Sequence, residues 1–203
     1  MAMLVGYEAN NAMRSAGPLG DYSRNLISRI ANMHVKDFRA LLFSTRIKDD
    51  YRTYFSGDSN VSTYVPTGTS KLLPEAWIRY RLNPWLKSEK VKIFHGLNEE
   101  LPYHIGREVK TVITCYGIKE HHRTSLMDIL LWRGRMRYAF SAADAVVAVS
   151  EQVKQELLDF GVNEKKIVVI SGGTDNPYEM NDEVAVRYFE LYQTLLKSSA
   201  SLT

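Results

Sequence analysis

The chain has 203 residues, of which 45% are hydrophobic and 24% charged, as is typical of a soluble globular protein with one α/β domain or two small ones. Its net charge of +3 is compatible with a phosphate-bearing partner but does not indicate a nucleic-acid-binding protein. Cys115 is the only cysteine, which excludes a disulfide framework and a thiolate metal site. The first ten residues, MAMLVGYEAN, lack the features of a signal peptide. No apolar run approaches the roughly 20 residues that span a bilayer, so we expect a cytoplasmic protein.

Short apolar runs alternate with amphipathic segments along the chain. The runs that predict strands are residues 3–7, 38–43, 61–65, 91–94, 111–115, 145–149 and 167–170. Helical spacing of apolar residues predicts helices from residue 21 onward, over 72–82 with an interruption at Pro84, over 124–141, from 150 to 161, and over 182–197. Residues 8–20 are predicted to be a glycine-containing loop, and residues 47–57 an irregular excursion.

Residues 139–173 form the clearest unit, a strand, a helix and a second strand. Ser150 is placed to cap the helix, Glu151 lies at its positive end, and Gly161 ends it. Two buried-type strands joined by a helix imply parallel pairing with a right-handed crossover. The rest of the chain repeats this plan, so the sequence predicts an α/β fold with a doubly wound parallel sheet.

Ligands of such sheets bind in the crevice at the carboxyl ends of the strands. Five stretches rich in glycine and polar residues follow predicted strands, and they are residues 10–20, 95–100, 116–120, 150–151 and 171–175. We therefore expect a ligand site on this edge of the sheet.

Gly17 and Gly20 lie between the first strand and the first long helix. They favour a phosphate cradle built from backbone N–H groups and a helix N-terminus, or else a plain βα turn. Their spacing does not match G-x-G-x-x-G, so the dinucleotide fingerprint is absent.

His95 and Gly96 follow the predicted strand 91–94. A histidine there can bind a sugar hydroxyl or transfer a proton, or it can fix the adjacent loop. Asn98 and Glu99 add hydroxyl-binding groups, although a solvated loop has the same composition.

Tyr116 and Gly117 follow the strand 111–115. The glycine allows close approach of a ligand, and the tyrosine can stack on it or donate a hydrogen bond, or simply lie at the rim of the sheet. His121 and His122 point in different directions, and no third ligand is placed by spacing, so no metal site is expected.

Aromatic and basic residues alternate in EAWIRYRLNPWLKSEK, which contains Trp77, Tyr80 and Trp85. The pattern fits a helix that contacts a membrane surface or an acceptor, and it also fits a covering helix with extended arginines. At most, we expect peripheral contact with a membrane.

Several motifs, in this order, resemble the amino-terminal domain of GT-B glycosyltransferases. They are SAGPLGDYSRNLI from residue 15, FHGLNEELP from 94, TVITCYGIKE from 111, and ADAVVAVSEQVKQELLDFGVNEKKIVVISGG from 143. More narrowly, they are similar to the large retaining group, family 4-like, that includes bacterial mannosyl- and glucosyltransferases for capsule and lipopolysaccharide.

The resemblance implies an acceptor-side domain that faces a donor-binding domain across a cleft. Gly17 and Gly20 would then lie near the donor phosphates, His95 and its loop would face the acceptor, and Ser150 and Glu151 would form the cleft wall. Together with Gly172 in the last of the five stretches, these residues make up the expected substrate-binding set. No catalytic residue and no cofactor are expected, because the nucleotide sugar is a substrate.

Two features depart from the family pattern. Tyr116 stands where a histidine that contacts the transferred sugar is usual, and tyrosine, with a pKa of about 10, is no proton carrier near neutral pH. The donor-binding domain is absent, and the tail EVAVRYFELYQTLLKS resembles the family's last helix, which packs back on the first domain. We therefore expect a Rossmann-like domain over residues 1–176 and a docking helix over 177–203.

The sequence thus predicts the acceptor-binding half of a glycosyltransferase for a saccharide or lipid-linked acceptor, inactive alone. The alternative is a non-catalytic glycan-binding or scaffold module that pairs with a separate donor-domain chain or self-associates through its cleft face. A nucleotide-dependent epimerase or reductase is a third reading, which the missing G-x-G-x-x-G and the missing Y-x-x-x-K pair at Tyr116 disfavour.

Overall fold

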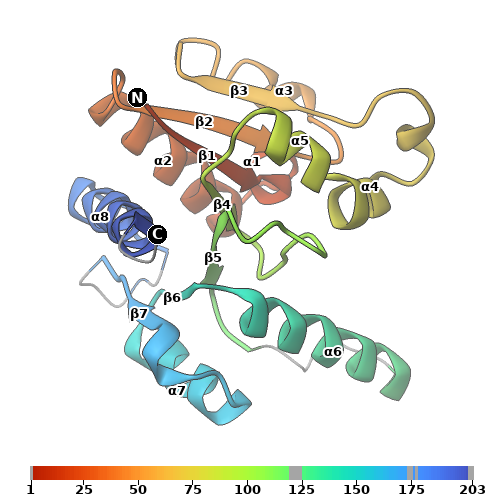
Figure 1. The fold of residues 1–203 in the computed structure, drawn as a ribbon, viewed down its shortest axis with the longest axis vertical. Helices are drawn as coiled ribbons and strands as arrows, with labels where there is room; N and C mark the ends of the chain where they lie inside the picture. Colours follow the sequence, from red (N-terminus) through yellow and green to blue (C-terminus); the bar gives the residue numbers. More distant parts are fainter. Residues whose placement is uncertain (1, 119–124, 173–175, 177, 201–203) are drawn as a thin grey trace.

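The structure is a computed structural model in which residues 2–118, 125–172, 176 and 178–200 are described. Seven strands within these residues form one sheet, ordered β3-β2-β1-β4-β5-β6-β7, and every neighbouring pair is parallel. The strands are β1 (Met3–Glu8), β2 (Phe38–Phe43), β3 (Val61–Tyr64), β4 (Ile93–Gly96), β5 (Lys110–Cys115), β6 (Ala145–Ala148) and β7 (Ile167–Val169). The predicted doubly wound α/β fold is confirmed (Figure 1).

The order of the strands reverses at the centre of the sheet. The chain runs outward from β1 through β2 to β3, and it then returns to the other side of β1 to form β4. Glu8 at the end of β1 is in register with Gly96 at the end of β4. The crevice between these two ends is the point where sheets of this kind bind ligands.

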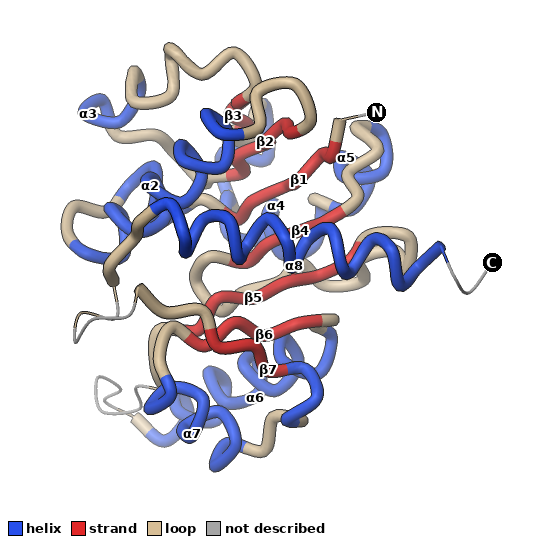
Figure 2. The backbone as a smooth tube through the Cα atoms, turned by 90° about the vertical axis from the view of Figure 1, so that its left-hand side faces the viewer, coloured by secondary structure: helices blue, strands red, loops and turns tan. Residues whose placement is uncertain are grey.

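Helices cover both faces of the sheet. In Figure 2, α2 and α8 lie in front of the strands, whereas α5 and α6 lie behind them. The helical segments are α1 (Asn10–Arg14), α2 (Pro18–Met33), α3 (Asp49–Arg52), η1 (Gly68–Leu72), α4 (Pro74–Arg81), α5 (Asn83–Ser88), α6 (Leu126–Ala142), α7 (Glu151–Phe160), η2 (Glu164–Lys166) and α8 (Asp182–Ala200).

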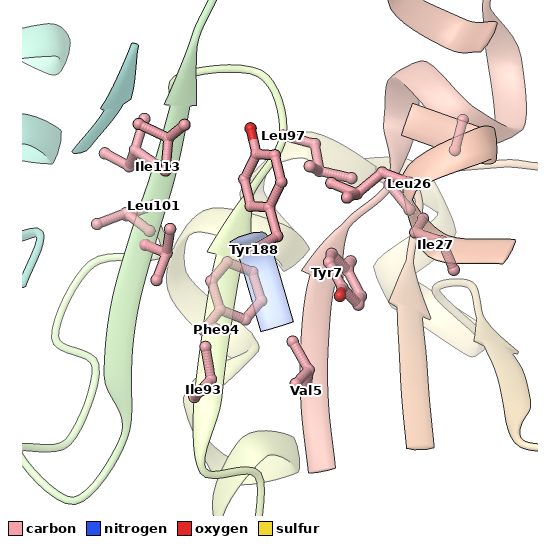
Figure 3. Packing of buried hydrophobic residues seen from close by; sticks show 14 of the residues in the cluster. Val5, Tyr7, Leu26, Ile27, Ile93, Phe94, Leu97, Leu101, Ile113 and Tyr188 are labelled. Atoms are coloured by element: carbon pink, nitrogen blue, oxygen red, sulfur yellow. The ribbon is translucent and has the colours of Figure 1, made fainter. Parts of the chain in front are cut away.

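A continuous buried hydrogen-bond chain fixes α8 on the sheet. Its members, in order, are Tyr7, Tyr192, His95, Thr114, Tyr188 and Tyr22. His95 Nδ1 lies 2.7 Å from the Tyr192 hydroxyl, and its Nε2 lies 2.8 Å from the Thr114 hydroxyl. Figure 3 shows Tyr188 among the packed side chains of β1, β4 and β5. The tail therefore packs back on the domain, as predicted.

The structure differs from the sequence-based expectation mainly between strands. Residues 8–20 are not a single loop, because they contain α1 and because α2 begins at Pro18, a residue suited to the first turn of a helix. The excursion 47–57 contains α3. The helix expected over 72–82 is α4, which begins two residues later than expected and follows η1, and Pro84 lies in the first turn of α5.

Candidate functional site

The loops that follow the strands gather at one edge of the sheet, because all the strands are parallel. Hydrogen bonds join four of these loops. Asn10 Oδ1 accepts from the Thr45 N–H at 2.9 Å, Asn11 Nδ2 donates to the Leu97 carbonyl at 3.4 Å, and the Tyr116 N–H donates to Glu99 Oε1 at 3.0 Å. We call this connected set of loops after β1, β2, β4 and β5 the carboxyl rim.

Part of the predicted site lies outside the described residues. This holds for residues 119–120 and 173–175 of the five stretches, and also for His121 and His122. The remaining residues of these stretches are placed by the structure.

The two glycines near β1 have different surroundings. Gly17 precedes α2 with φ of +99°, and a Cβ atom there would meet nothing within 4 Å. Gly20 lies inside α2, where a Cβ would come within 2.1 Å of the Ser15 carbonyl oxygen. Gly17 thus lies in open space before α2, whereas Gly20 allows the chain's own backbone to approach.

His95 does not follow β4 but lies within it, and it is completely buried. Burial lowers the pKa of His95 to about 3, so its imidazole is neutral. Both ring nitrogens are occupied by the hydrogen-bond chain to α8. This geometry leaves His95 no free nitrogen for a sugar and makes it an anchor for α8.

Gly96 ends β4 and is also buried, with the Glu100 carbonyl oxygen 2.1 Å from where a Cβ would be. The backbone of the following loop therefore approaches Gly96 too closely for a side chain. Glu99 in this loop has φ of +58°, a left-handed conformation that is costly for a residue with a side chain. That conformation accompanies the hydrogen bond from the Tyr116 N–H to its carboxylate.

Asn98 is the residue of this loop with unused hydrogen-bonding capacity. Its side chain is half-buried, and its Oδ1 atom is shielded from solvent without a partner among the described residues. A shielded amide oxygen without a partner is an unsatisfied hydrogen-bond acceptor, which is uncommon in a folded protein.

Tyr116 is buried at the rim, where its ring makes an edge-to-face contact with Tyr22 and stacks on Tyr178. Burial raises the pKa of its hydroxyl well above the ordinary value, so Tyr116 stays protonated. Gly117 beside it has φ of +137°, which favours glycine.

The last two stretches serve the elements beside them. Ser150 caps α7 by accepting a hydrogen bond from the Val153 N–H at 3.2 Å, as predicted, and Glu151 is exposed in the first turn. At Gly172 a Cβ would lie 2.8 Å from the Cβ of Glu179, so this position packs against the segment that leads to α8.

Glu8 is a rim residue that the sequence analysis did not select. It ends β1 at the switch point, and only 1% of it is exposed. Burial, together with the negative charges of Glu100 and Glu75, raises the pKa of Glu8 to about 8. Its Oε1 accepts from the Asn10 N–H at 3.2 Å, whereas Oε2 has no partner among the described residues. The position of Glu8 directly after the apolar run of the first strand was the sequence signal that could have identified it.

The sequence analysis also did not select a hollow at the carboxyl ends of β2 and β3. We call it the β2–β3 pocket; its volume is about 350 Å³, and it is lined by Thr45, Arg46, Ile47, Arg52, Val65, Pro66 and Lys71. The residues that follow these two strands were not among the five stretches, although the same rule of strand ends applies to them.

Within the described ranges, no three His, Cys, Asp or Glu side chains are grouped as metal ligands would be. None of the helices in those ranges has both the length and the apolar character of a membrane-crossing segment.

The family model described as Glycosyltransferase Family 4 matches residues 29–176, well over half of the chain. The chain belongs to Glycosyltransferase Family 4. This family module has the Rossmann-like fold of GT-B glycosyltransferases, as the motifs predicted. No curated protein matches its sequence.

Solved structures with the same fold share little sequence with this family module. A glycosyltransferase from Rickettsia africae ESF-5 has a TM-score of 0.54 and 17% identity, over 95% of this chain and 50% of its own. Anabaena HepE in complex with UDP-glucose has a TM-score of 0.55 and 12% identity, over 86% and 45%. A UDP-N-acetylglucosamine 2-epimerase has a TM-score of 0.53 and 13% identity, over 84% and 48%. The family module spans about half the length of these proteins.

Proposed function

We propose that this chain is the acceptor-binding part of a glycosyltransferase that moves a sugar from a nucleotide-sugar donor to a saccharide or lipid-linked acceptor. The carboxyl rim carries the proposal, because it joins the loops on both sides of the switch point in a member of Glycosyltransferase Family 4. The likeness to a protein solved with UDP-glucose supports a nucleotide sugar as the donor substrate.

The proposed roles of the rim residues follow from their hydrogen bonds and their surroundings. Asn98 offers an unused amide oxygen to an acceptor hydroxyl, beside the strained Glu99. Gly17 leaves the N-terminus of α2 open for a donor phosphate, because helix N-termini favour anions. His95, Gly96 and Gly20 act indirectly, by fixing the loops and α8.

The proposal includes weak or absent activity of this chain alone. Sugar transfer requires stabilisation of the departing diphosphate, and a second, donor-binding domain would supply most of it. We further propose that residues 1–176 form the domain, that 177–203 dock on it, and that the protein is cytoplasmic with at most peripheral membrane contact.

Titration of the ¹⁵N-labelled chain with a panel of neutral oligosaccharides, followed by NMR, tests the proposal. We expect shifts at the carboxyl rim and at least fivefold weaker binding for Asn98→Ala. The matched control is Asn32→Ala, since Asn32 lies exposed on α2 and its side-chain amide donates to Ser28 of its own helix. If no oligosaccharide binds, or if both variants bind equally well, the acceptor role is wrong.

Two assays on the same sample separate the remaining functions. Robust transfer from UDP-glucose by the isolated chain would contradict its proposed inactivity. Interconversion of UDP-N-acetylglucosamine without an acceptor would instead indicate an epimerase, whose fold is equally similar.

A non-catalytic glycan-binding or scaffold module is the second candidate function. The burial of Tyr116 supports it, since a protonated, buried hydroxyl replaces the residue most associated with the chemistry. A chain that binds a glycan but does not bind UDP-glucose would support this candidate. Co-purification with a donor-domain chain would support a split enzyme, and a concentration-dependent dimer would support self-association.

A further inference from the structure

The β2–β3 pocket lies on the same edge of the sheet as the carboxyl rim. Thr45, which lines the pocket, donates hydrogen bonds to Asn10 Oδ1 from its N–H at 2.9 Å and from its hydroxyl at 2.8 Å. The pocket is therefore joined directly to the loop after β1. Neighbouring strands lie about 4.8 Å apart, so the end of β2 is about 10 Å from the end of β4. A short saccharide can bridge that span.

The charge of the pocket is positive and partly uncompensated. Arg52 is paired with Asp49 at 3.0 Å, and Arg14 beside the pocket is held by Thr45 and Glu75. Arg46 follows β2 and Lys71 follows β3; both line the pocket, and both are exposed without an acidic partner in the described part of the chain. Two free cations at one concave site favour an anion, and guanidinium and ammonium groups both bind phosphate well.

The remaining wall of the pocket is apolar. It consists of Ile47, Val65 and Pro66, and Val65 is 37% exposed. Directly after Lys71, Leu72 and Leu73 are 81% and 70% exposed. In Figure 1 the segment between β3 and α4 that carries these leucines projects beyond the carboxyl ends of the strands. Cations and exposed leucines side by side suit a ligand that is anionic at one end and apolar at the other.

We propose that the β2–β3 pocket binds the phosphate or diphosphate of an amphiphilic acceptor, and that Leu72 and Leu73 contact its apolar chain. The phosphate contacts are Arg46 and Lys71, and the attached saccharide extends past Thr45 toward the switch point. The assignment of an acceptor class to the pocket rests on the proposed function. Binding of phosphate at the pocket does not depend on that function.

The test uses isothermal titration calorimetry with three soluble probes: inorganic pyrophosphate, farnesyl diphosphate and farnesol. We expect farnesyl diphosphate to bind more tightly than pyrophosphate, and farnesol to bind weakest. The double variant R46Q/K71Q should lose at least tenfold in affinity for both diphosphates. Because both side chains are exposed, the variant should keep the circular dichroism spectrum of the parent.

The matched control is K36Q/R39Q, which removes one lysine and one arginine, both exposed, near the opposite end of β2. Its affinities should stay within twofold of the parent. A second variant, L72S/L73S, should weaken farnesyl diphosphate but not pyrophosphate. Equal losses in R46Q/K71Q and K36Q/R39Q would overturn the proposal, because they would indicate only a general effect of charge.

Vesicles distinguish a bilayer headgroup from a soluble phosphate. Binding to phosphatidylglycerol vesicles without any binding of farnesyl diphosphate would overturn the acceptor assignment. If farnesol bound as tightly as farnesyl diphosphate, the proposed contacts of Arg46 and Lys71 with the phosphate would be wrong. If the oligosaccharide titration fails while R46Q/K71Q still abolishes diphosphate binding, the proposed function is wrong and the anion site stands.

Discussion

Glu8→Gln is the perturbation with the most direct physical consequence. The folded protein keeps the Glu8 carboxyl buried at the end of β1, where burial, followed by the negative charge of Glu100, raises its pKa to about 8. The unfolded chain exposes the same carboxyl with its ordinary pKa of about 4.3. Glutamine has the shape of the protonated acid and can keep the hydrogen bond from the Asn10 N–H.

The sign of the effect follows from proton binding. Between pH 4.5 and 8 the folded protein retains a proton on Glu8 that the unfolded chain releases, so the free energy of unfolding falls as the pH rises. Each pH unit in this window lowers the free energy of unfolding by about 1.4 kcal/mol, so this free energy falls by about 3 kcal/mol between pH 4.5 and pH 7. Glu8→Gln removes this term, and the variant should be more stable than the parent above pH 6.

Urea denaturation followed by circular dichroism at pH 5.5, 7 and 8.5 measures the difference. The parent should lose stability across the series, whereas Glu8→Gln should lose much less. Glu190→Gln is the control, because Glu190 is exposed on α8. Parallel pH profiles for the parent and Glu8→Gln would refute the reasoning and would mean that Glu8 is ionised in the folded protein.

Three further predictions concern the packing around the site. Tyr192→Phe removes the hydroxyl that contacts His95 and Tyr7, and it should lower the free energy of unfolding by about 1–3 kcal/mol. Tyr80→Phe, on the surface, should leave this free energy unchanged, and urea titration of both variants measures the difference. The pKa of His95 is lowered to about 3 by burial, so stability should fall as the pH drops below 6.5, and His95→Asn should flatten that acid limb even if it is less stable overall. Gly20→Ala should destabilise the protein by about 1–3 kcal/mol, because the new Cβ would clash with the Ser15 carbonyl oxygen. Gly134→Ala lies in an exposed and open part of α6 and should stabilise the protein by about 0.5–1 kcal/mol. Thermal melts that rank the two variants in the opposite order would contradict the packing.

The architecture was predictable because its signals are local. The buried strands are short apolar runs, and amphipathic helices such as α2 and α7 lie between several of them, so parallel order follows from the alternation. The start and end of α7 were equally readable: Ser150 caps it, and Gly161 ends it with φ of +94°. Pro18 was an overlooked local signal, and it begins α2 earlier than expected.

The candidate site was predictable only as an edge of the sheet. The sequence cannot distinguish a glycine that admits a ligand from one that admits the chain's own backbone, and Gly20 and Gly96 are of the second kind. His95 is an anchor because Tyr192 reaches it from 97 positions away, and no local pattern records that contact. Burial of the Glu8 carboxyl is likewise a result of tertiary packing.

The docking of α8 also sets an order of events during synthesis. Tyr7 and Tyr192 are hydrogen-bonded across 185 positions, so one face of the central strands stays uncovered until the ribosome has released α8. Until then the nascent chain exposes apolar and tyrosine-rich surface from β1, β4 and β5, to which chaperones can bind.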